Sequence, residues 1–432
     1  MTTPSRRRFL SRLGTLGLAA TLPAGQAARP LALPSSAKSA TDLASDEGWW
    51  RAVARLYDRT DEIVNLENGY WGMMARPVLD AFIRNTKRVN RDSSWYARRE
   101  FNTDAAAVMA RLATAFGTSS EEVVLTRNAT EALQVLITGY NGLRPGDTVL
   151  YADIDYPAMQ TAMASLEARR GVRAVKIDMP EPATYQTVID AYERALAAHP
   201  KTRLVLLTHL THRTGLMTPV AELTRLAKAR GAEVIVDAAH SWGQVPFDAP
   251  DLGADFIGFN LHKWLGAPMG LGMMYVRRDR TRDIDNFLGE PNYPTDDIRG
   301  KVNLGTYNYP ALLTVPTAID VHEAIGVDRK AARLRWLRNR WVGAVHDVPG
   351  IEVLVPDDER MHGGLTAFRL SGKTSREENV ALVKRLADEF GIFTTHRTGL
   401  ASGACVRVTP ALFTAAEDVD RLAGALKIVG AR

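Results

Sequence analysis

The sequence predicts an α/β fold: a large domain with a mostly parallel, mixed β-sheet flanked by helices, followed by a small α/β domain. Two observations carry this prediction. Short apolar runs, typical of buried strands, recur at residues 148–152, 203–208, 234–236 and 255–259. Two of these runs stop at polar residues, at Asp237 and at residues 260–263. In open α/β sheets ligands bind at the carboxyl ends of parallel strands, so we expect the functional site there.

Local patterns predict the remaining elements. We expect an amphipathic helix carrying Trp49, Val53, Leu56 and Tyr57, then a short strand at 63–66. A strand at 122–126 precedes a helix that opens within 127–133, and residues 284–310 are expected to be irregular. A long helical pattern runs from Ala311 through Trp341, and the small domain has strands at 365–370, 392–395 and 406–408.

The predicted organisation has four parts. Residues 1–28 are a targeting segment, 29–46 a linker rich in Pro, Ser and Ala, 47–315 the large domain and 316–432 the connecting helix and small domain. Packing of the first helix on the small domain is left open.

The first 28 residues predict export. Residues 5–10 resemble a twin-arginine signal, an apolar stretch follows at 13–22, and small residues at 25–28 offer a cleavage site. The alternative is a chance basic start. Because the stretch is too short to span a bilayer, we expect no stable membrane anchor. The twin-arginine machinery carries folded proteins, so a periplasmic protein loaded with its cofactor is predicted.

Charge and cysteine content exclude other classes. The formal net charge is +5, but the targeting segment holds four arginines and no acid, so removing it leaves about +1. Nothing here favours a nucleic-acid partner. Cys405 is the single cysteine, which excludes internal disulfides.

Asp237 and Lys263, 26 residues apart, predict one specific chemistry. Pyridoxal phosphate needs a lysine for a Schiff base and an acid against the pyridine nitrogen. The alternative is an ordinary strand-end acid with a surface lysine. The flanking residues VDAAH…DFIGFNLHKWLGAPMGLGMMYVR favour the first interpretation. They resemble the class V aminotransferase family of fold-type-I pyridoxal-phosphate enzymes, which includes cysteine desulfurases and isopenicillin N epimerase, and the likeness extends over most of residues 60–415.

The resemblance implies a set of cofactor-binding residues. Residues 127–132, at a predicted helix start where backbone N–H groups bind phosphate, resemble the family's phosphate loop. Ala129 and Thr130 would hold the phosphate, the alternative being a helix with Thr as its cap. Tyr156 would stack on the pyridine ring, where desulfurases have a histidine, or be a core tyrosine.

Further cofactor contacts are implied nearer the lysine. His240 would donate to the phenolic oxygen, and Asn260 and His262 would contact the phosphate. Gly305 and Thr306 resemble the family segment that reaches the neighbouring subunit's phosphate. If this carries over, the protein is a homodimer with shared sites; the alternative is a surface loop.

The resemblance also places residues near the substrate. Arg407 aligns with the family arginine that clamps the α-carboxylate, against the alternative of a strand-edge arginine. Asn68 and Tyr70 lie in a turn near the substrate or are plain turn residues. His212 is expected to act near the phenolic oxygen or as a proton shuttle, or to be structural. His396 and Arg397 occupy the loop that carries the desulfurase cysteine, so desulfurase chemistry is excluded.

These expectations combine into one predicted function. Lys263 would remove the α-proton of an amino-acid or peptide-like substrate, giving epimerisation or transamination, as in tailoring a secreted siderophore peptide. The alternatives are a β-lyase without a cysteine nucleophile and a non-catalytic exported binding protein. A nicotinamide-dependent dehydrogenase is a weaker rival because the phosphate loop lacks G-x-G-x-x-G.

Overall fold

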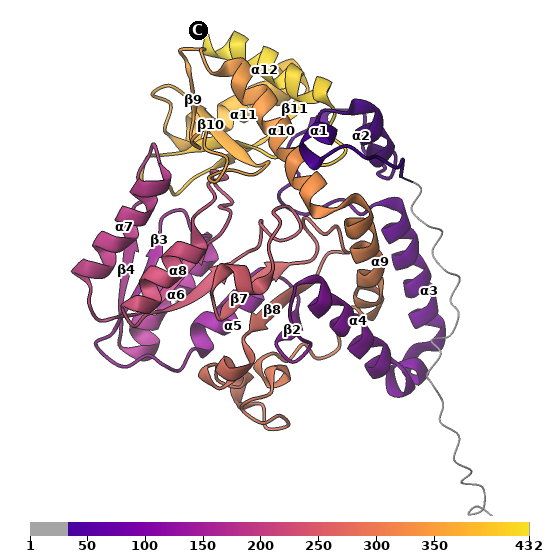
Figure 1. The fold of residues 1–432 in the computed structure, drawn as a ribbon, viewed down its shortest axis with the longest axis vertical. Coiled ribbons are helices and arrows are strands. Elements are labelled where there is room, and N and C mark those ends of the chain that lie inside the picture. Colours follow the sequence, from indigo (N-terminus) through magenta and orange to yellow (C-terminus); the bar gives the residue numbers. More distant parts are fainter. Residues whose placement is uncertain (1–32, 432) are drawn as a thin grey trace, which may run out of the picture. The chain divides into compact units, whose positions relative to one another are not determined.

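A seven-stranded sheet forms the centre of the large domain in the computed structural model, which describes residues 33–431 (Figure 1). The strand order is β2-β8-β7-β6-β5-β3-β4. Strand β8 is antiparallel to both of its neighbours, and the other neighbouring strands pair in parallel. The predicted mostly parallel, mixed sheet is confirmed. Its strands are β2 Val123–Thr126, β3 Thr148–Ala152, β4 Arg173–Ile177, β5 Thr202–Thr208, β6 Glu233–Asp237, β7 Phe256–Asn260 and β8 Gly272–Val276.

The predicted strands of this sheet agree with the observed ones to within one residue at each end. The reason is burial on both faces, which leaves runs that are apolar throughout. Strand β4 was not predicted. It lies at the edge of the sheet, where Arg173 and Lys176 are exposed, so its sequence lacks the apolar run.

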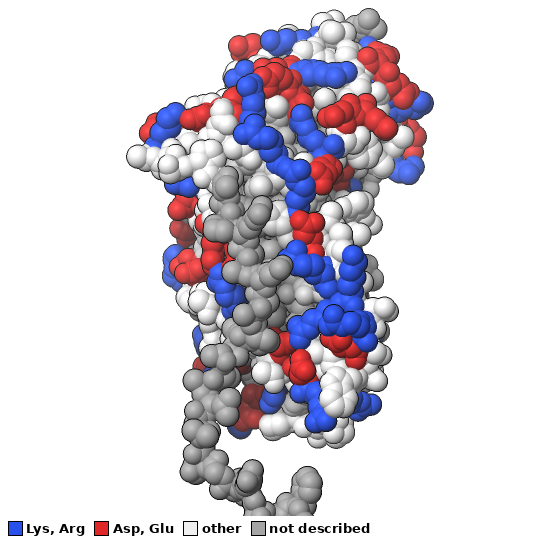
Figure 2. Space-filling model, turned by 90° about the vertical axis from the view of Figure 1, so that its right-hand side faces the viewer, with Lys and Arg blue, Asp and Glu red and all other residues white. Residues whose placement is uncertain are grey.

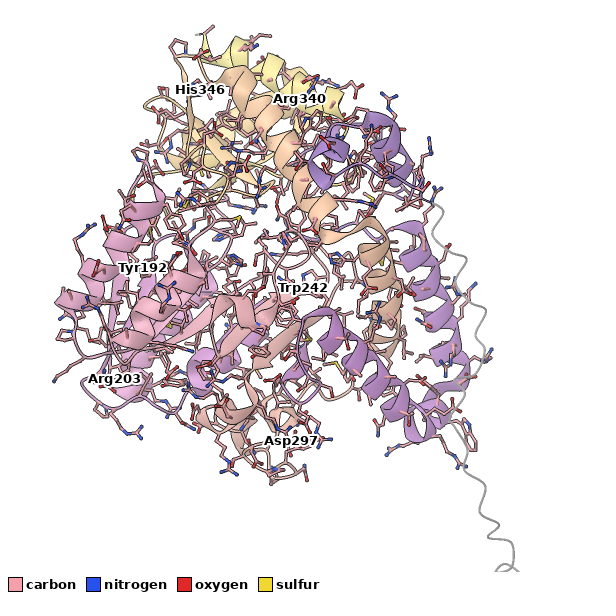
Figure 3. All side chains as sticks on the ribbon, in the orientation of Figure 1. Tyr192, Arg203, Trp242, Asp297, Arg340 and His346 are labelled. Atoms are coloured by element: carbon pink, nitrogen blue, oxygen red, sulfur yellow. The ribbon has the colours of Figure 1, made fainter. Side chains whose placement is uncertain are left out.

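Four helices connect the strands: α5 Ala129–Gly139, α6 Pro157–Arg170, α7 Tyr185–Ala198 and α8 Val220–Ala229. Helix α5 buries Leu133, Leu136 and Ile137 in the hydrophobic core that it shares with strands β6 to β8. At the other side of β7, Trp242 packs against Phe259 and Phe116, with ring centroids 5.0 and 5.7 Å away (Figure 3). These contacts support the loops that follow β6 and β7.

The N-terminal segment corrects one prediction. Residues 29–46 were expected to be a linker, but they contain helix α1 (Ala40–Ala44), which Ser39 caps. Leu43 is fully buried, and its carbonyl accepts a hydrogen bond of 2.8 Å from the indole of Trp50 in α2 (Glu47–Ala54). The segment is rich in Pro, Ser and Ala, so its composition does not reveal that Leu43 is buried. The predicted signal, residues 1–28, lies outside the described residues.

The expected long helix after Ala311 is two helices, α9 (Tyr309–Ile325) and α10 (Val327–Val345). They are separated by Gly326, whose φ of +88° is unfavourable for other residues. Helices α3 (Arg76–Arg99) and α4 (Phe101–Ala115) pack against α9 (Figure 1). The preceding irregular segment is confirmed as irregular apart from short turns.

The small domain contains a four-stranded antiparallel sheet in the order β12-β13-β10-β9. Its elements are β9 Ile351–Val353, β10 Thr366–Leu370, α11 Arg376–Phe390, β12 Thr395–Arg397, β13 Cys405–Val408 and α12 Ala416–Gly430. The strand predicted at 392–395 is interrupted at Thr394, which separates β11 (Ile392–Phe393) from β12. Strand β11 pairs in parallel with β1 (Val64–Asn65). This pairing joins the region of residues 64–65 to the small domain.

The N-terminal segment also makes ion pairs with the C-terminal part of the chain. Glu47 pairs with the buried Arg333 of α10, and Arg59 is 3.1 Å from Asp418 of α12. Helix α2, the amphipathic helix predicted around Trp49, therefore packs on residues of the predicted C-terminal part, 316–432. The sequence had left open whether this packing occurs.

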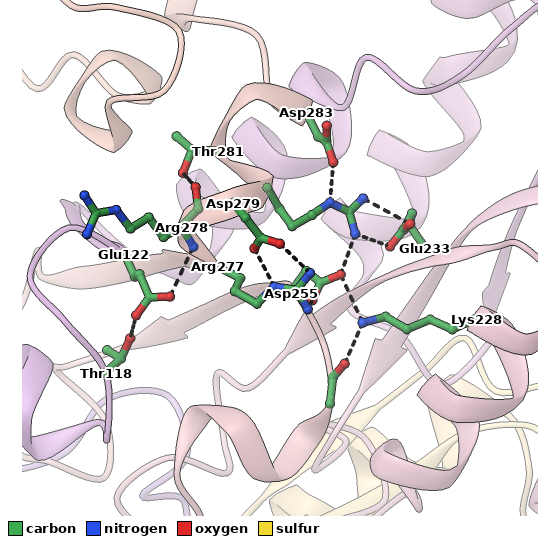
Figure 4. A network of polar contacts seen from close by, with 12 residues as sticks. Thr118, Glu122, Lys228, Glu233, Asp255, Arg277, Arg278, Asp279, Thr281 and Asp283 are labelled. Carbon is green, nitrogen blue, oxygen red and sulfur yellow. Dashed lines mark hydrogen bonds and ion pairs between the residues drawn. The ribbon is translucent and has the colours of Figure 1, made fainter.

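An ionic network around the buried Asp255 holds the amino end of the central strands (Figure 4). Asp255, just before β7, pairs with Arg277 at 2.6 Å, Arg280 at 2.7 Å and Lys228 at 3.0 Å. Arg280 also pairs with Glu233 at 3.0 Å. The network lies at the opposite end of β6 and β7 from Asp237 and Asn260, so it is structural.

On the face shown in Figure 2, basic and acidic side chains are interspersed. Among residues 33–431 we find no helix with the length and apolar character that crossing a bilayer requires.

Candidate active site

The polar residues predicted from strand ends meet at the carboxyl edge of the sheet. Asp237 is the last residue of β6 and Asn260 the last of β7, and the two strands pair in parallel with Asp237 opposite Gly258. Lys263 follows in the loop after β7. The structure therefore brings the predicted acid and lysine to one edge.

Asp237 is a buried carboxylate with little protein support for its charge. Its Oδ1 accepts one hydrogen bond of 2.9 Å, from the backbone N–H of Ala239. Within the described part of the chain it forms no ion pair of 4.0 Å or less. Burial raises its pKa, and the charge of Lys263 offsets part of that effect. A cation placed against this carboxylate would be stabilised.

Lys263 extends toward His240, with 2.9 Å between Nζ and the histidine Nε2. Burial lowers the lysine pKa to about 8, and Asp237 opposes the shift. The segment around Gly72 holds the loop that carries Lys263, because the Gly72 N–H donates to the His262 carbonyl at 2.7 Å. A Cβ on Gly72 would lie 1.8 Å from the Lys263 carbonyl oxygen. Gly72 follows the predicted turn of Asn68 and Tyr70, and the sequence reasoning missed its role in holding the lysine loop.

Three histidines surround the lysine region. His240 and His212 are buried, and neither Nδ1 has a partner among residues 33–431. Burial, together with nearby cations, lowers the pKa of both, so they are neutral at pH 7. His262 donates from Nδ1 to the Leu271 carbonyl at 2.8 Å, since that carbonyl can only accept. The exposed ring of Tyr156 lies edge-on to His212, at 5.0 Å.

The predicted phosphate loop is the start of α5. The cap is Asn128, whose Oδ1 accepts from the Glu131 N–H at 2.9 Å, so the alternative of a threonine cap is wrong. Asn260 Oδ1 accepts from the Ala129 N–H at 2.8 Å. That carbonyl oxygen therefore fixes the helix start, and the Asn260 amide and the Thr130 N–H are the donors left for an anion.

The predicted substrate arginine already holds a carboxylate. Arg407 is 1% exposed and donates from Nη2 to both oxygens of Glu67, at 2.5 and 2.7 Å. Its Nη1 donates to the His212 carbonyl at 2.7 Å. Arg397 lies 3.3 Å from Glu67 through its Nη2. The sequence reasoning missed Glu67, although it is an acid directly before the singled-out turn.

The other predicted substrate residues do different things. Asn68 donates from Nδ2 to the carbonyls of Asn65 and Thr409, both at 3.0 Å, which favours a structural role. Tyr70 is 70% exposed. Gly305 and Thr306 are exposed before α9 and make no hydrogen bond to the site of their own chain. Their predicted contact with a second subunit stays a prediction.

The residues present fit pyridoxal phosphate. Asp237 is a buried acid without an ion pair of 4.0 Å or less among residues 33–431, and a protonated pyridine nitrogen would supply a cation. Lys263 has a depressed pKa, and the Nδ1 atoms of the buried His240 and His212 have no partner within the same residues. The N-terminus of α5 offers backbone donors for a phosphate.

Comparison with known proteins identifies the family of the chain. The family model described as aminotransferase class-V matches residues 76–422. Isopenicillin N epimerase of Streptomyces clavuligerus is 28% identical over 398 residues, which are 88% of this chain and 97% of that protein. Cysteine desulfurase of Haloferax volcanii is 26% identical over 395 residues, 85% and 90% of the two chains. The solved structure of apo cysteine desulfurase from Thermococcus onnurineus NA1 has the same fold, with a TM-score of 0.74, 19% identity and coverage of 87% and 97%. The chain is therefore an enzyme of the aminotransferase class-V family, which uses pyridoxal 5'-phosphate.

Proposed function

We propose that this chain is an exported enzyme that binds an amino-acid or peptide-like substrate and removes its α-proton, giving epimerisation or transamination. The observation that carries the proposal is the pair at the sheet edge: Lys263, 2.9 Å from His240, and the buried Asp237 without a protein cation. When bound, pyridoxal phosphate supplies an electron sink for charge that develops at the α-carbon.

Lys263 is the proposed base. A pKa of about 8 makes the neutral amine available near neutral pH, which an ordinary lysine would not provide. His240 is neutral, so its Nε2 accepts a hydrogen bond from the Lys263 ammonium or donates one to the neutral Lys263 amine. The pair can therefore hold the transferred proton at Nζ. Asp237 would hold a cationic ring nitrogen of the bound cofactor, because loss of that cation would leave a buried anion unpaired.

Epimerisation delivers a proton to the opposite face of the α-carbon, and we propose His212 as the carrier of that proton. It is neutral and buried, and its Nδ1 has no partner within the described residues. The relative named isopenicillin N epimerase supports this outcome and a peptide-like substrate, such as a secreted siderophore peptide. Transamination would need no second carrier of this kind, because Lys263 would both remove and deliver the proton.

A β-lyase without a cysteine nucleophile is the second candidate. Cys405 is fully buried, and burial raises its pKa to about 12, so it cannot serve as a thiolate. This observation argues against persulfide chemistry on a cysteine, while leaving β-elimination to the same Lys263.

The first experiment is the visible spectrum of the purified protein with pyridoxal phosphate, beside Lys263→Ala. We expect a band that borohydride fixes onto Lys263 and that the variant lacks. Exchange of the α-proton with deuterium in candidate substrates should then depend on Lys263. Binding without any exchange, in every amino acid tried, would favour the non-catalytic binding protein instead.

Export is tested separately. We expect the protein in the periplasmic fraction, and expect Arg6→Lys combined with Arg7→Lys to retain it in the cytoplasm. Equal distribution of both forms would contradict the twin-arginine proposal.

A further inference from the structure

We propose that Glu67 limits this site to substrates with one carboxylate near the α-carbon, because it neutralises Arg407 and leaves a single guanidinium, that of Arg397, for the substrate. The inference rests on the proposed function and names a residue that determines its substrate class.

Glu67 and Arg407 form a buried ion pair. Both carboxylate oxygens accept from Nη2, at 2.5 and 2.7 Å, and the arginine's Nη1 is used by the His212 carbonyl. The side chains are 9% and 1% exposed. Breaking such a pair leaves an uncompensated buried charge, so a substrate carboxylate gains little by displacing Glu67.

The backbone holds Glu67 in this position. Its segment bridges Thr409 in parallel, and its N–H donates to Asn65 Oδ1 at 2.9 Å. Gly69 packs directly on the arginine, since a Cβ there would lie 2.8 Å from Arg407 Nη2. Glu67 is thus a fixed part of the site and does not resemble a mobile surface acid.

Arg397 is the more weakly paired of the two arginines, although the Nε of Arg407 also has no partner among residues 33–431. Its Nη2 is 3.3 Å from Glu67, and its Nη1 makes only two long contacts of 3.4 Å, with Thr395 and the His396 carbonyl. Its Nε has no partner among residues 33–431. The side chain is 24% exposed, so a ligand can reach it. Two guanidinium groups against one carboxylate leave one positive charge, which matches one substrate carboxylate.

The test compares one-carboxylate and two-carboxylate ligands. In the pyridoxal-phosphate-loaded protein, L-alanine and L-aspartate are titrated by visible absorbance. We expect wild type to prefer L-alanine, and Glu67→Gln, which keeps the shape, to shift the ratio of dissociation constants toward L-aspartate by about tenfold or more. Arg397→Gln should weaken L-alanine by about tenfold while leaving L-alaninamide unchanged.

Two controls make the result specific. Glu62→Gln removes an exposed acid from the same segment and should change neither ratio. Thermal unfolding monitored by circular dichroism checks that each variant is folded. An unchanged ligand preference in folded Glu67→Gln, or unchanged L-alanine binding in folded Arg397→Gln, overturns the proposal.

A second measurement separates this proposal from the cofactor chemistry. Acetate and succinate are titrated calorimetrically into the full chain without cofactor. We expect Arg397→Gln to lose acetate binding and Glu67→Gln to gain succinate binding. If the spectral band of the loaded protein is absent while these shifts occur, the proposed function fails and the role of Glu67 stands. Absence of acetate binding to wild type overturns the role of Glu67.

Discussion

Burial sets the chemistry of single residues in this site. Lys263 and Asp237 both lose hydration, which moves their pKa values in opposite directions, downward for the amine and upward for the acid. Each shift disfavours the charged form, and each group depends on the other or on a ligand to offset it. In the cofactor-free protein, the burial of these two charged groups is therefore unfavourable at the place where the cofactor would bind.

One prediction follows for stability against pH. The pKa of Lys263 falls from 10.5 to about 8 on folding, so the unfolded chain binds more protons between these values. Below pH 8 the shift destabilises the folded cofactor-free protein, and stability recovers as pH rises toward 10.5. Lys263→Met should be more stable than wild type by about 3 kcal/mol at pH 7, with the difference nearly vanishing at pH 10.5.

Urea unfolding of both proteins at the two pH values measures this difference. A difference that does not depend on pH would indicate a packing effect of methionine and contradict the charge explanation.

A second prediction at the residue scale concerns Gly72. Because a Cβ would lie 1.8 Å from the Lys263 carbonyl, Gly72→Ala must displace the lysine loop. We expect a loss of about 2 kcal/mol in unfolding free energy and weaker binding of pyridoxal phosphate, measured by urea unfolding and absorbance.

The matched control is Gly343→Ala in helix α10, where a Cβ would meet nothing within 4 Å. It should raise the unfolding free energy by about 0.5–1 kcal/mol. Equal effects of the two substitutions would contradict the close approach at Gly72.

At the scale of elements, the start of α5 combines a capping side chain, a backbone N–H that is hydrogen-bonded to β7, and donors that remain for an anion. Asn128 caps the helix and Asn260 holds the Ala129 N–H, so the position of the helix depends on both side chains. The predicted phosphate site is therefore built by β7 as well as by α5.

Asn128→Ala should lower the unfolding free energy by about 1 kcal/mol, as loss of a helix cap does, and weaken inorganic phosphate binding to the cofactor-free protein. Calorimetry and urea unfolding measure the two effects. Thr130→Ala should leave stability almost unchanged, because the cap is Asn128; a comparable loss there would restore the threonine-cap interpretation.

At the scale of the whole molecule, the exposed Gly305 and Thr306 lead to a prediction about assembly. If this loop completes the phosphate site of a second copy, Lys263→Ala and Thr306→Glu damage different sites of a dimer. Mixed and reassociated, the two inactive proteins should regain about a quarter of wild-type activity, since half of the dimers are mixed and each has one intact site.

Sedimentation equilibrium of wild type should show the dimer. Failure of the mixture to regain activity, with mixed dimers verified by a tag on one variant, would mean that the sites are not shared.

Most strands of the sheet, and the residues at its carboxyl edge, could be predicted from the sequence alone. Strands β3 and β5 to β7 are buried on both faces, so their runs are apolar and their ends are marked by Asp237 and Asn260. A local signal of this kind needs no knowledge of neighbours. The family pattern around Lys263 is equally local, because the lysine, the histidine before it and the glycines after it lie in one short stretch of the chain.

Tertiary structure decided what these residues contact. Helix α1 forms because Leu43 meets Trp50 and α10, and the predicted strand at 392–395 divides because β1 pairs with only its first part. Glu67 meets Arg407 across 340 residues, so no local pattern reveals that the substrate arginine is already paired. Charge pairing and burial depend on which distant segments pack together, and only the folded chain brings them into contact.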